Sequence, residues 1–371
     1  MRKYKNFNIP IIKKHLKALE EYKSNIDISK LSEYELAFLE DIINFYKDVL
    51  SQKELTTYFD CPEEANILDL RDFNNKYLKL IDKYIPYYET FNDRLYNAIE
   101  KYDLKNLYAE IIEYPENDTA YTNKHALSIT HDFYNSLPDK EIRDIFNKEF
   151  KKKAQNIRFK DDNSITFYSK MIDYNFITIG NGSNFEKITS LAHEYGHIVN
   201  DRILGEYIDY ESEYPFVELF SMFMETLSID YLNEKNNMKR ATAVELQQLM
   251  EIYDHSYNIL ALDDTKNLVF KNEDELKEYY KKEFSEIFLE NNSTVTIDYY
   301  HNYTFPFMVI IELLHEYNKD PEKALYLLKE IIKLKDCDYI KELNNKGIHI
   351  NTHINNYVKQ LTKKINNSYH N

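Results

Sequence analysis

The sequence predicts a mainly α-helical protein with two lobes and a small β-sheet beside one of its helices. The chain has only 5 glycines and 8 prolines in 371 residues, and so few helix breakers favour long helices joined by short loops. Apolar residues recur at helical spacing over most of the chain. Two short strand patterns are confined to residues 164–180, with Ile165 and Phe167 in the first and Phe176, Ile177 and Ile179 in the second.

The N-terminal part is expected to contain several amphipathic helices within residues 11–114, interrupted near Pro62, and two more within residues 124–155. A chain of this length exceeds a typical single core, so we expect two lobes. We place an N-terminal helical lobe at residues 1–120 and a second lobe at residues 121–371. The cleft between two such lobes is a common position for a binding site.

The helix expected from residue 183 onwards has the clearest boundaries. Ser183 and Glu186 form a capping-box pattern, and Gly205 is suited to end the helix. The apolar residues between them cluster on one side, roughly opposite His193 and His197. These two histidines are therefore expected on a polar surface and not in the core.

The two histidines belong to the pattern H-E-x-x-H, which reads His193-Glu194-Tyr195-Gly196-His197. Residues four apart on a helix share a face, so both imidazoles can bind one metal ion. Glu194 lies to the side, where a carboxylate can hold and deprotonate a metal-bound water molecule. The pattern therefore predicts a Zn²⁺ site with two ligands and a general base, and accidental surface histidines are the alternative.

A third ligand is expected from an apolar helix that begins near Tyr214. Glu218 and Glu225 are seven residues apart and fall on one face, with Ser221 nearby. Carboxylates in so apolar a helix are costly to bury unless they meet a cation or hydrogen-bond donors. We assign Glu218 as the third zinc ligand and Glu225 as the acceptor of a hydrogen bond from a ligand histidine. The two glutamates could exchange roles, and an ordinary buried ion pair is the alternative.

The remainder of the chain is also expected to be helical. Helices are expected at residues 241–260, at residues 273–289 and from Asp298 to Glu316, followed by two or three terminal helices. The helix from Asp298 begins with an aromatic segment that contains Tyr299, Tyr300, His301 and Tyr303.

Composition excludes several classes of partner. The net charge of −16 disfavours binding to nucleic acids and to anionic membrane surfaces. Two cysteines, Cys61 and Cys337, imply neither a disulfide framework nor a thiolate zinc site. The N-terminal residues lack the apolar core of a signal peptide, and no run approaches the ~18 apolar residues of a membrane-spanning helix. We therefore expect a cytoplasmic protein, and the sequence indicates no oligomeric state.

These motifs resemble the thimet oligopeptidase and oligoendopeptidase F family of zinc peptidases. The matching segments are residues 191–197, which contain H-E-x-x-H, and residues 217–225, in which Glu218, Ser221 and Glu225 fit the family pattern E-x-x-S-x-x-x-E. Residues 299–307 resemble the aromatic segment that binds substrate in the family, residues 176–181 resemble the strand before the metal helix, and residues 339–347 resemble the family's tail.

The sequence also departs from the family pattern. Asn200 stands where a histidine that does not bind metal is common, so zinc binding should survive. The histidine of the aromatic segment is displaced to His301, and Tyr303 aligns only if a gap is allowed. The glycines usually found around residues 163–167 are missing, and the N-terminal lobe is shorter than in typical relatives. We therefore expect a more open cleft.

The resemblance implies a zinc-dependent endopeptidase that hydrolyses short unfolded oligopeptides by metal-activated water. One Zn²⁺ per chain would be held by His193, His197 and Glu218 in the second lobe, with Glu194 as general base and with Ser221 and Glu225 supporting the ligands. Tyr303 and His301 would stabilise the oxyanion, and Tyr299 and Tyr300 would bind substrate, with aromatic packing as the alternative for the tyrosines.

The strand at Phe176 and Ile177 could pair with an extended peptide by edge addition. Two other functions are open. One is a non-peptidase zinc amidohydrolase, and the other is a peptide-binding protein that has lost turnover. The intact Glu194 argues against the second, because binding alone has no chemical need for a base.

Overall fold

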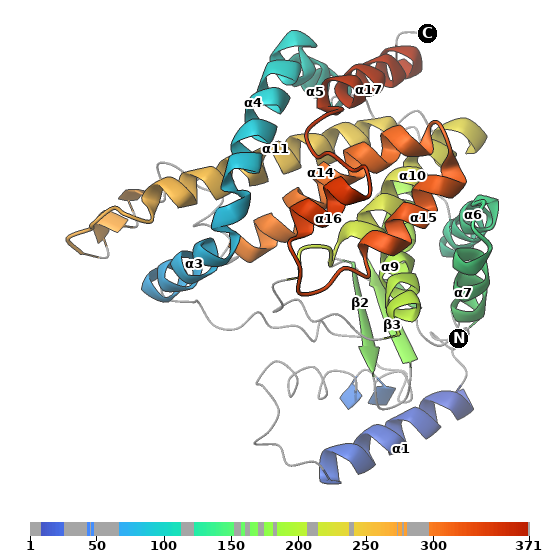
Figure 1. Cartoon of the computed structure of the whole chain (residues 1–371). Helices are drawn as coiled ribbons and strands as arrows, with labels where there is room; N and C mark the ends of the chain where they lie inside the picture. Colours follow the sequence, from blue (N-terminus) through green and yellow to red (C-terminus); the bar gives the residue numbers. More distant parts are fainter. Residues whose placement is uncertain are drawn as a thin grey trace.

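Helices dominate the computed structural model of the chain, as the sequence predicted (Figure 1). None of the described helices is both long and apolar enough to cross a membrane. Ser183 of the predicted capping box and most of the helix predicted at residues 273–289 lie outside the described residues, and the division into two lobes stays a prediction. The structure describes residues 9–25, 43–44, 46–47, 67–112, 122–151, 157–159, 164–169, 174–180, 184–205, 214–236, 241–272, 274–276, 278–279 and 297–369.

The N-terminal elements are helices whose ends follow from local sequence. Pro86 lies in the first turn of α4, where a missing backbone N–H costs nothing. Thr122 and Asp139 cap the helices that begin at Asn123 and Lys140, because each side chain accepts a hydrogen bond from the backbone N–H three residues on. The elements are α1 (Ile9–Asn25), α3 (Ile67–Ile81), the 3-10 turn η2 (Asp82–Tyr84), α4 (Ile85–Lys101), α5 (Leu104–Ile112), α6 (Asn123–Ser136) and α7 (Lys140–Phe150).

The small sheet has three strands, one more than the sequence indicated. They are β1 (Ile157–Phe159), β2 (Ile165–Ser169) and β3 (Tyr174–Ile179), in the order β1-β3-β2. The additional strand β1 pairs parallel to β3, and β2 pairs antiparallel to it. Strands β2 and β3 both contact the next helix, α9 (Asn184–Leu204). The strand that leads directly into α9 is therefore the central one.

Helix α9 has the orientation that its apolar pattern predicted. Ile188, Leu191 and Ile198 are fully buried, whereas His193 and His197 are only half-buried. The helix ends at Gly205, whose positive φ of 72° suits a glycine after the last turn. The N–H of Gly205 donates to the carbonyl of Asp201 at 2.9 Å. One side of α9 thus packs in the core, and the side with the histidines is left for polar contacts.

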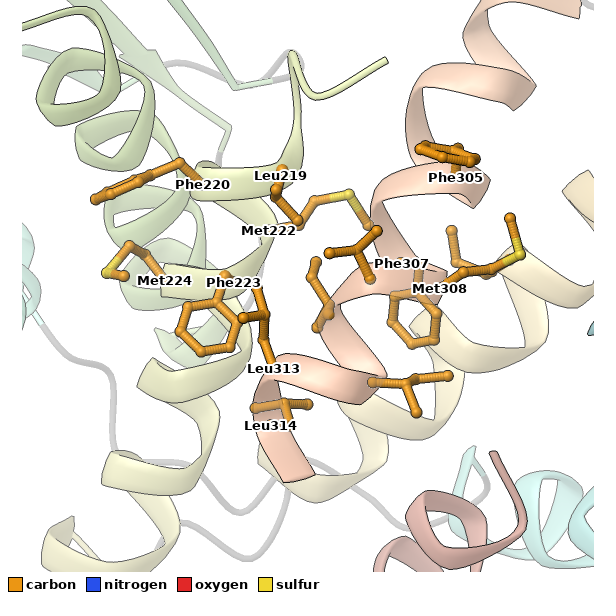
Figure 2. Close-up of a cluster of buried hydrophobic side chains, with 14 of the residues drawn as sticks. Leu219, Phe220, Met222, Phe223, Met224, Phe305, Phe307, Met308, Leu313 and Leu314 are labelled. Carbon is orange, nitrogen blue, oxygen red and sulfur yellow. The ribbon is translucent and has the colours of Figure 1, made fainter. Parts of the chain in front are cut away.

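Helix α10 (Leu219–Asn236) lies along α9, and its first half is apolar almost all round. Its other neighbours are α11 (Ala241–Thr265) and α14 (Ile297–Tyr317). Figure 2 shows the apolar side chains between α10 and α14, among them Leu219, Met222, Phe223, Phe307, Leu313 and Leu314. The chain closes with α15 (Pro321–Ile331), α16 (Tyr339–Asn345) and α17 (Ile354–Tyr369), so three terminal helices are present (Figure 1).

Gly196 allows α9 and α10 to approach closely. A Cβ atom at this position would lie 2.6 Å from Cα of Ser221 and 3.2 Å from its Cβ. Contacts as short as 2.6 Å do not occur between carbon atoms that are not bonded, so any larger residue would force the helices apart. Since Gly196 belongs to H-E-x-x-H and Ser221 follows Glu218 by one turn, this contact places both motifs side by side.

We predict that Gly196→Ala lowers the free energy of unfolding. Overpacking costs about 1–3 kcal/mol, and the closest atom here is backbone that cannot rotate away. This cost exceeds the roughly 1 kcal/mol by which alanine is favoured over glycine in a helix. Chemical denaturation would measure the difference. Gly205→Asn is the matched control, because no atom lies within 4 Å of its Cβ position and asparagine tolerates positive φ. An alanine variant at position 196 that is as stable as the native protein would contradict the prediction.

Candidate metal centre

Three side chains bring a nitrogen or an oxygen atom to the same point. Nε2 of His193 lies 3.1 Å from Nε2 of His197, and Oε2 of Glu218 lies 3.2 Å from each of these nitrogens. The histidines are one turn apart on α9, and Glu218 is the last residue before α10. Within the described ranges, no second group of three His, Cys, Asp or Glu side chains converges in this way.

Glu225 and Ser221 hold two of these side chains in place. Nδ1 of His193 lies 2.9 Å from Oε2 of Glu225, so the ring can donate its Nδ1–H to this carboxylate. This hydrogen bond leaves the lone pair of Nε2 directed at His197 and Glu218. The Ser221 hydroxyl lies 2.9 Å from Oε2 of Glu218 and can donate to it. Glu218 therefore converges with the two histidines, and Glu225 contacts the other nitrogen of His193.

The electrostatics of the cluster favour a cation. Burial opposes a charge on His193, but its hydrogen bonds with Glu218 and Glu225 hold its pKa well above the ordinary value of 6.5. Burial also opposes a charge on His197, but the carboxylate of Glu218 outweighs it and raises this pKa. The histidines in turn hold the pKa of Glu218 well below its usual value, against the effect of burial. The carboxylates therefore favour a positive charge at this point in spite of its burial.

The three side chains fit a zinc ion. Two imidazole nitrogens and one carboxylate oxygen are a common ligand set for Zn²⁺ in sites that keep one position open. Two ligands held ~2.0–2.1 Å from a tetrahedral zinc ion lie roughly 3.3 Å apart, close to the separations of 3.1 and 3.2 Å between the three atoms.

Glu194 lies next to the two histidines and is buried, with 4% of its surface exposed. Oε2 of its carboxylate is buried and has no hydrogen-bond partner among the described residues. Burial raises the pKa of this carboxyl, while the charges of His193 and His197 lower it. The hydroxyl of Thr166 on β2 donates to the backbone carbonyl of Glu194 at 3.2 Å, and this bond fixes α9 against the sheet. Glu194 thus has an oxygen available for a ligand.

Tyr303 and Tyr299 lie one turn apart on α14, near enough to this cluster for the charge of Glu218 to act on both. Burial, and then the charges of Glu218 and nearby groups that include Glu194, raise the pKa of Tyr303 well above its ordinary value. Burial, Glu251 and Glu218 raise the pKa of Tyr299 in the same way. The two rings are 4.7 Å apart, and 43% of Tyr299 is exposed. Both hydroxyls therefore stay protonated and can act as hydrogen-bond donors.

The prediction that His301 acts at the site is wrong. Its ring packs against Tyr77, Tyr84 and Phe305, and the hydroxyl of Tyr88 lies 2.6 Å from its Nδ1. Burial, followed by the charge of Lys83, lowers the pKa of His301 to about 3. His301 is two residues from Tyr299 and from Tyr303, so it lies about 200° away around the helix. It anchors the opposite face of α14.

Two of the predicted substrate-binding positions are also corrected. Tyr300 is buried, and its ring lies 5.1 Å from that of His255, so it is part of the core. Ile177 pairs with Ile157 of β1 on one side and with Thr166 of β2 on the other.

An extended peptide therefore cannot add to β3 at Ile177, because both of its edges are occupied there. The backbone of Phe176 pairs with that of Phe167 of β2, and its side chain lies outside the part of the chain that the structure describes. The sequence missed this arrangement because β1, at only three residues, is too short to give a pattern of alternation.

His255 is a residue that the sequence did not single out. It lies on α11, and its ring is 5.5 Å from that of Tyr299 and 6.2 Å from that of Tyr303. No motif surrounds it in the sequence, and only the contact between α11 and α14 brings it to these tyrosines. Nothing in the local sequence could have indicated this position.

We predict that Glu218→Ala reduces bound zinc more strongly than Glu225→Ala. Glu218 supplies one of the three converging atoms, whereas Glu225 contacts only the distant nitrogen of His193. Losing a carboxylate that supports a ligand typically weakens metal affinity by about 10–100-fold, and losing the ligand itself should cost more. Elemental analysis and competition with a chelator would measure both. The reverse ranking would show that the two glutamates have exchanged roles.

Comparisons with known proteins agree on the fold. No protein-family model matches the chain, and no curated protein matches its sequence. The solved structure of PZ peptidase A with an inhibitor covers 97% of this chain at a TM-score of 0.51 and 12% identity, and the match covers 69% of that protein. The resemblance that the motifs indicated therefore extends to the three-dimensional fold.

A second match is a protein from Bacillus anthracis str. Ames assigned to oligoendopeptidase F. It covers 91% of this chain at a TM-score of 0.47 and 13% identity. This chain spans 64% of the length of that protein. The fold is therefore inferred from the match to PZ peptidase A alone, and at identities this low the activity has to be argued from the site.

Proposed function

We propose that this protein is a zinc-dependent endopeptidase that hydrolyses short, unfolded oligopeptides. The observation that carries the proposal is the convergence of His193, His197 and Glu218 beside the unpaired carboxylate oxygen of Glu194. Ligands for a metal and a base for a proton are the two requirements of metal-assisted hydrolysis. The fold shared with PZ peptidase A favours a peptide over other amides as substrate.

The zinc ion would be held by His193, His197 and Glu218, with Glu225 and Ser221 maintaining their orientation. A zinc ion bound there supplies Lewis acidity toward a carbonyl group and lowers the pKa of water. The carboxylate of Glu218 brings only one negative charge to the ligand set, so much of the charge of the ion stays available to the substrate.

Glu194 is the proposed general base. Its buried Oε2 has no competing hydrogen bond in the described structure, so it can accept a proton from the attacking water molecule. Burial raises its pKa, which makes the carboxylate a stronger base than an exposed glutamate. The same carboxyl group can then give the proton to the leaving amine. A single residue would thereby serve both proton transfers.

Tyr303 is the proposed donor to the oxyanion that develops on the carbonyl oxygen. Its hydroxyl stays protonated, and its place within helix α14 orients the ring before the substrate binds. Tyr299 is one turn away and partly exposed, a position suited to contact with the bound peptide. His301 takes no part, because its ring is enclosed on the other side of α14.

We predict that Glu194→Gln abolishes nearly all peptide hydrolysis and keeps one zinc ion per chain. Glutamine has almost the same shape but cannot accept the proton at neutral pH. Zinc content and cleavage of a set of unstructured peptides, compared with small amides, would be measured together. Glu141→Gln, at an exposed carboxylate on α7, is the control for the substitution. Retained turnover in the Glu194→Gln protein would exclude this mechanism, and cleavage of small amides alone by the native protein would favour an amidohydrolase.

We further predict that Tyr303→Phe lowers kcat about 10²–10³-fold, the usual effect of removing one donor to an oxyanion. The metal content should not change, because the Tyr303 hydroxyl is not one of the converging atoms. Tyr317→Phe is a matched control on the same helix, where the ring packs against Phe223. A Tyr303→Phe protein with native kcat would assign this tyrosine to packing alone.

A further inference from the structure

His255, a half-buried residue of α11, lies in an unusual setting for a histidine. Its ring is surrounded by those of Tyr299, Tyr300 and Tyr303, at centroid distances of 5.5, 5.1 and 6.2 Å. No ion pair or hydrogen bond to His255 is present within the described structure. A polar ring therefore lies among aromatic side chains without a hydrogen-bond partner among the described residues.

The tyrosines connect His255 to the metal cluster. Tyr303 is close enough to Glu218 and Glu194 for their charges to affect its pKa, and Tyr299 responds to Glu218. His255 contacts these two rings from the neighbouring helix α11, which lies beside α14 (Figure 1). Tyr299 is 43% exposed, and His255 is half-buried. The imidazole thus borders the surface that would receive a peptide.

The state of the ring follows from its surroundings. Burial lowers the pKa of His255 to about 4, so the imidazole is uncharged at neutral pH and carries a single proton. Its Nδ1 is buried and has no hydrogen-bond partner among the described residues. An unpaired N–H group buried away from water is rarer and costlier than an unpaired acceptor. The proton therefore belongs on Nε2.

We propose that His255 is a substrate-binding residue whose Nε2–H donates a hydrogen bond to a backbone carbonyl of the bound peptide next to Tyr299. The inference deepens the proposed function and rests on it. It assigns to α11 a share of peptide recognition, in addition to the residues of α9, α10 and α14 that form the site.

The surroundings select the kind of acceptor. Glu251 and Glu218 both act on Tyr299, so an anionic acceptor such as a carboxylate or a phosphate would be repelled there. The neutral imidazole of His255 carries no positive charge that could offset the repulsion of an anion by these two glutamates. A backbone carbonyl is a neutral acceptor that every peptide offers at each residue, so the contact would hold the main chain without selecting a side chain.

The experiment measures peptide binding in the zinc-loaded Glu194→Gln protein, where the probe is not consumed. The probe is a dye-labelled, unstructured peptide of alanine and glycine, and its dissociation constant is measured by fluorescence anisotropy. Three substitutions at His255 are compared. Phenylalanine keeps the ring packing without a donor, glutamine places an amide nitrogen near the position of Nε2, and asparagine places it near that of Nδ1.

We expect His255→Phe to weaken binding about 2- to 12-fold, the effect of losing one neutral hydrogen bond. His255→Asn should behave like phenylalanine, and His255→Gln should stay close to the parent. Zinc content should stay at one ion per chain in all three. His131→Phe is the matched control. His131 lies on α6, and its ring also packs on aromatic rings, those of Phe146 and Phe150 on α7.

Two results would overturn the inference. One is equal affinity of the phenylalanine variant and the parent, which would reduce His255 to ring packing, and the other is a parent protein that does not bind the probe. Failure of the proposed function looks different. In that case the protein with native Glu194 would cleave no peptide, while the ranking of the His255 variants in binding would be unaffected.

Discussion

The close contact between α9 and α10 at Gly196 is the constraint on which the candidate site depends. The three converging atoms come from helix α9 and from Glu218, which directly precedes α10, and they are only 3.1–3.2 Å apart. A glycine against the backbone of Ser221 lets the two helices approach closely at this level of the site. The same serine then donates to Glu218. Ser221 therefore has two roles. Its backbone packs against Gly196, and its hydroxyl orients Glu218.

Helix α14 has one face that packs in the core and another that lies near the site. His301 and Phe305 lie on the face that packs against α3 and α4, where the hydroxyl of Tyr88 holds the His301 ring. Tyr299 and Tyr303 lie on the other face. Since about 200° separate His301 from either tyrosine, fixing the histidine also fixes the direction of both phenol rings. An anchor outside the site thus determines the orientation of the proposed donor within it.

The sequence predictions are accurate where the interacting residues are close in sequence, and they fail where these residues are far apart. The spacing of His193 and His197, and that of Glu218 and Glu225, is set by helix geometry, so the motifs predicted the cluster. The aromatic segment offered four polar rings within five residues, and its helical phase could not be deduced from so dense a run. His255 depends on a contact between helices distant in sequence, and the pairing of Ile177 depends on the three-residue strand β1. Local patterns carry no information on either.

The histidines also show how burial can produce opposite chemistry in one protein. His193 and His197 are surrounded by carboxylates, so their pKa values rise and the cluster favours a cation. His255 and His301 are surrounded by aromatic rings, so burial dominates, and both pKa values fall. The first environment is suited to a metal ion and the second to a neutral hydrogen bond, which His301 has found in Tyr88. His255 also lies among aromatic rings, but it is half-buried and has no such partner among the described residues. This difference is the physical reason to assign its hydrogen bond to a ligand.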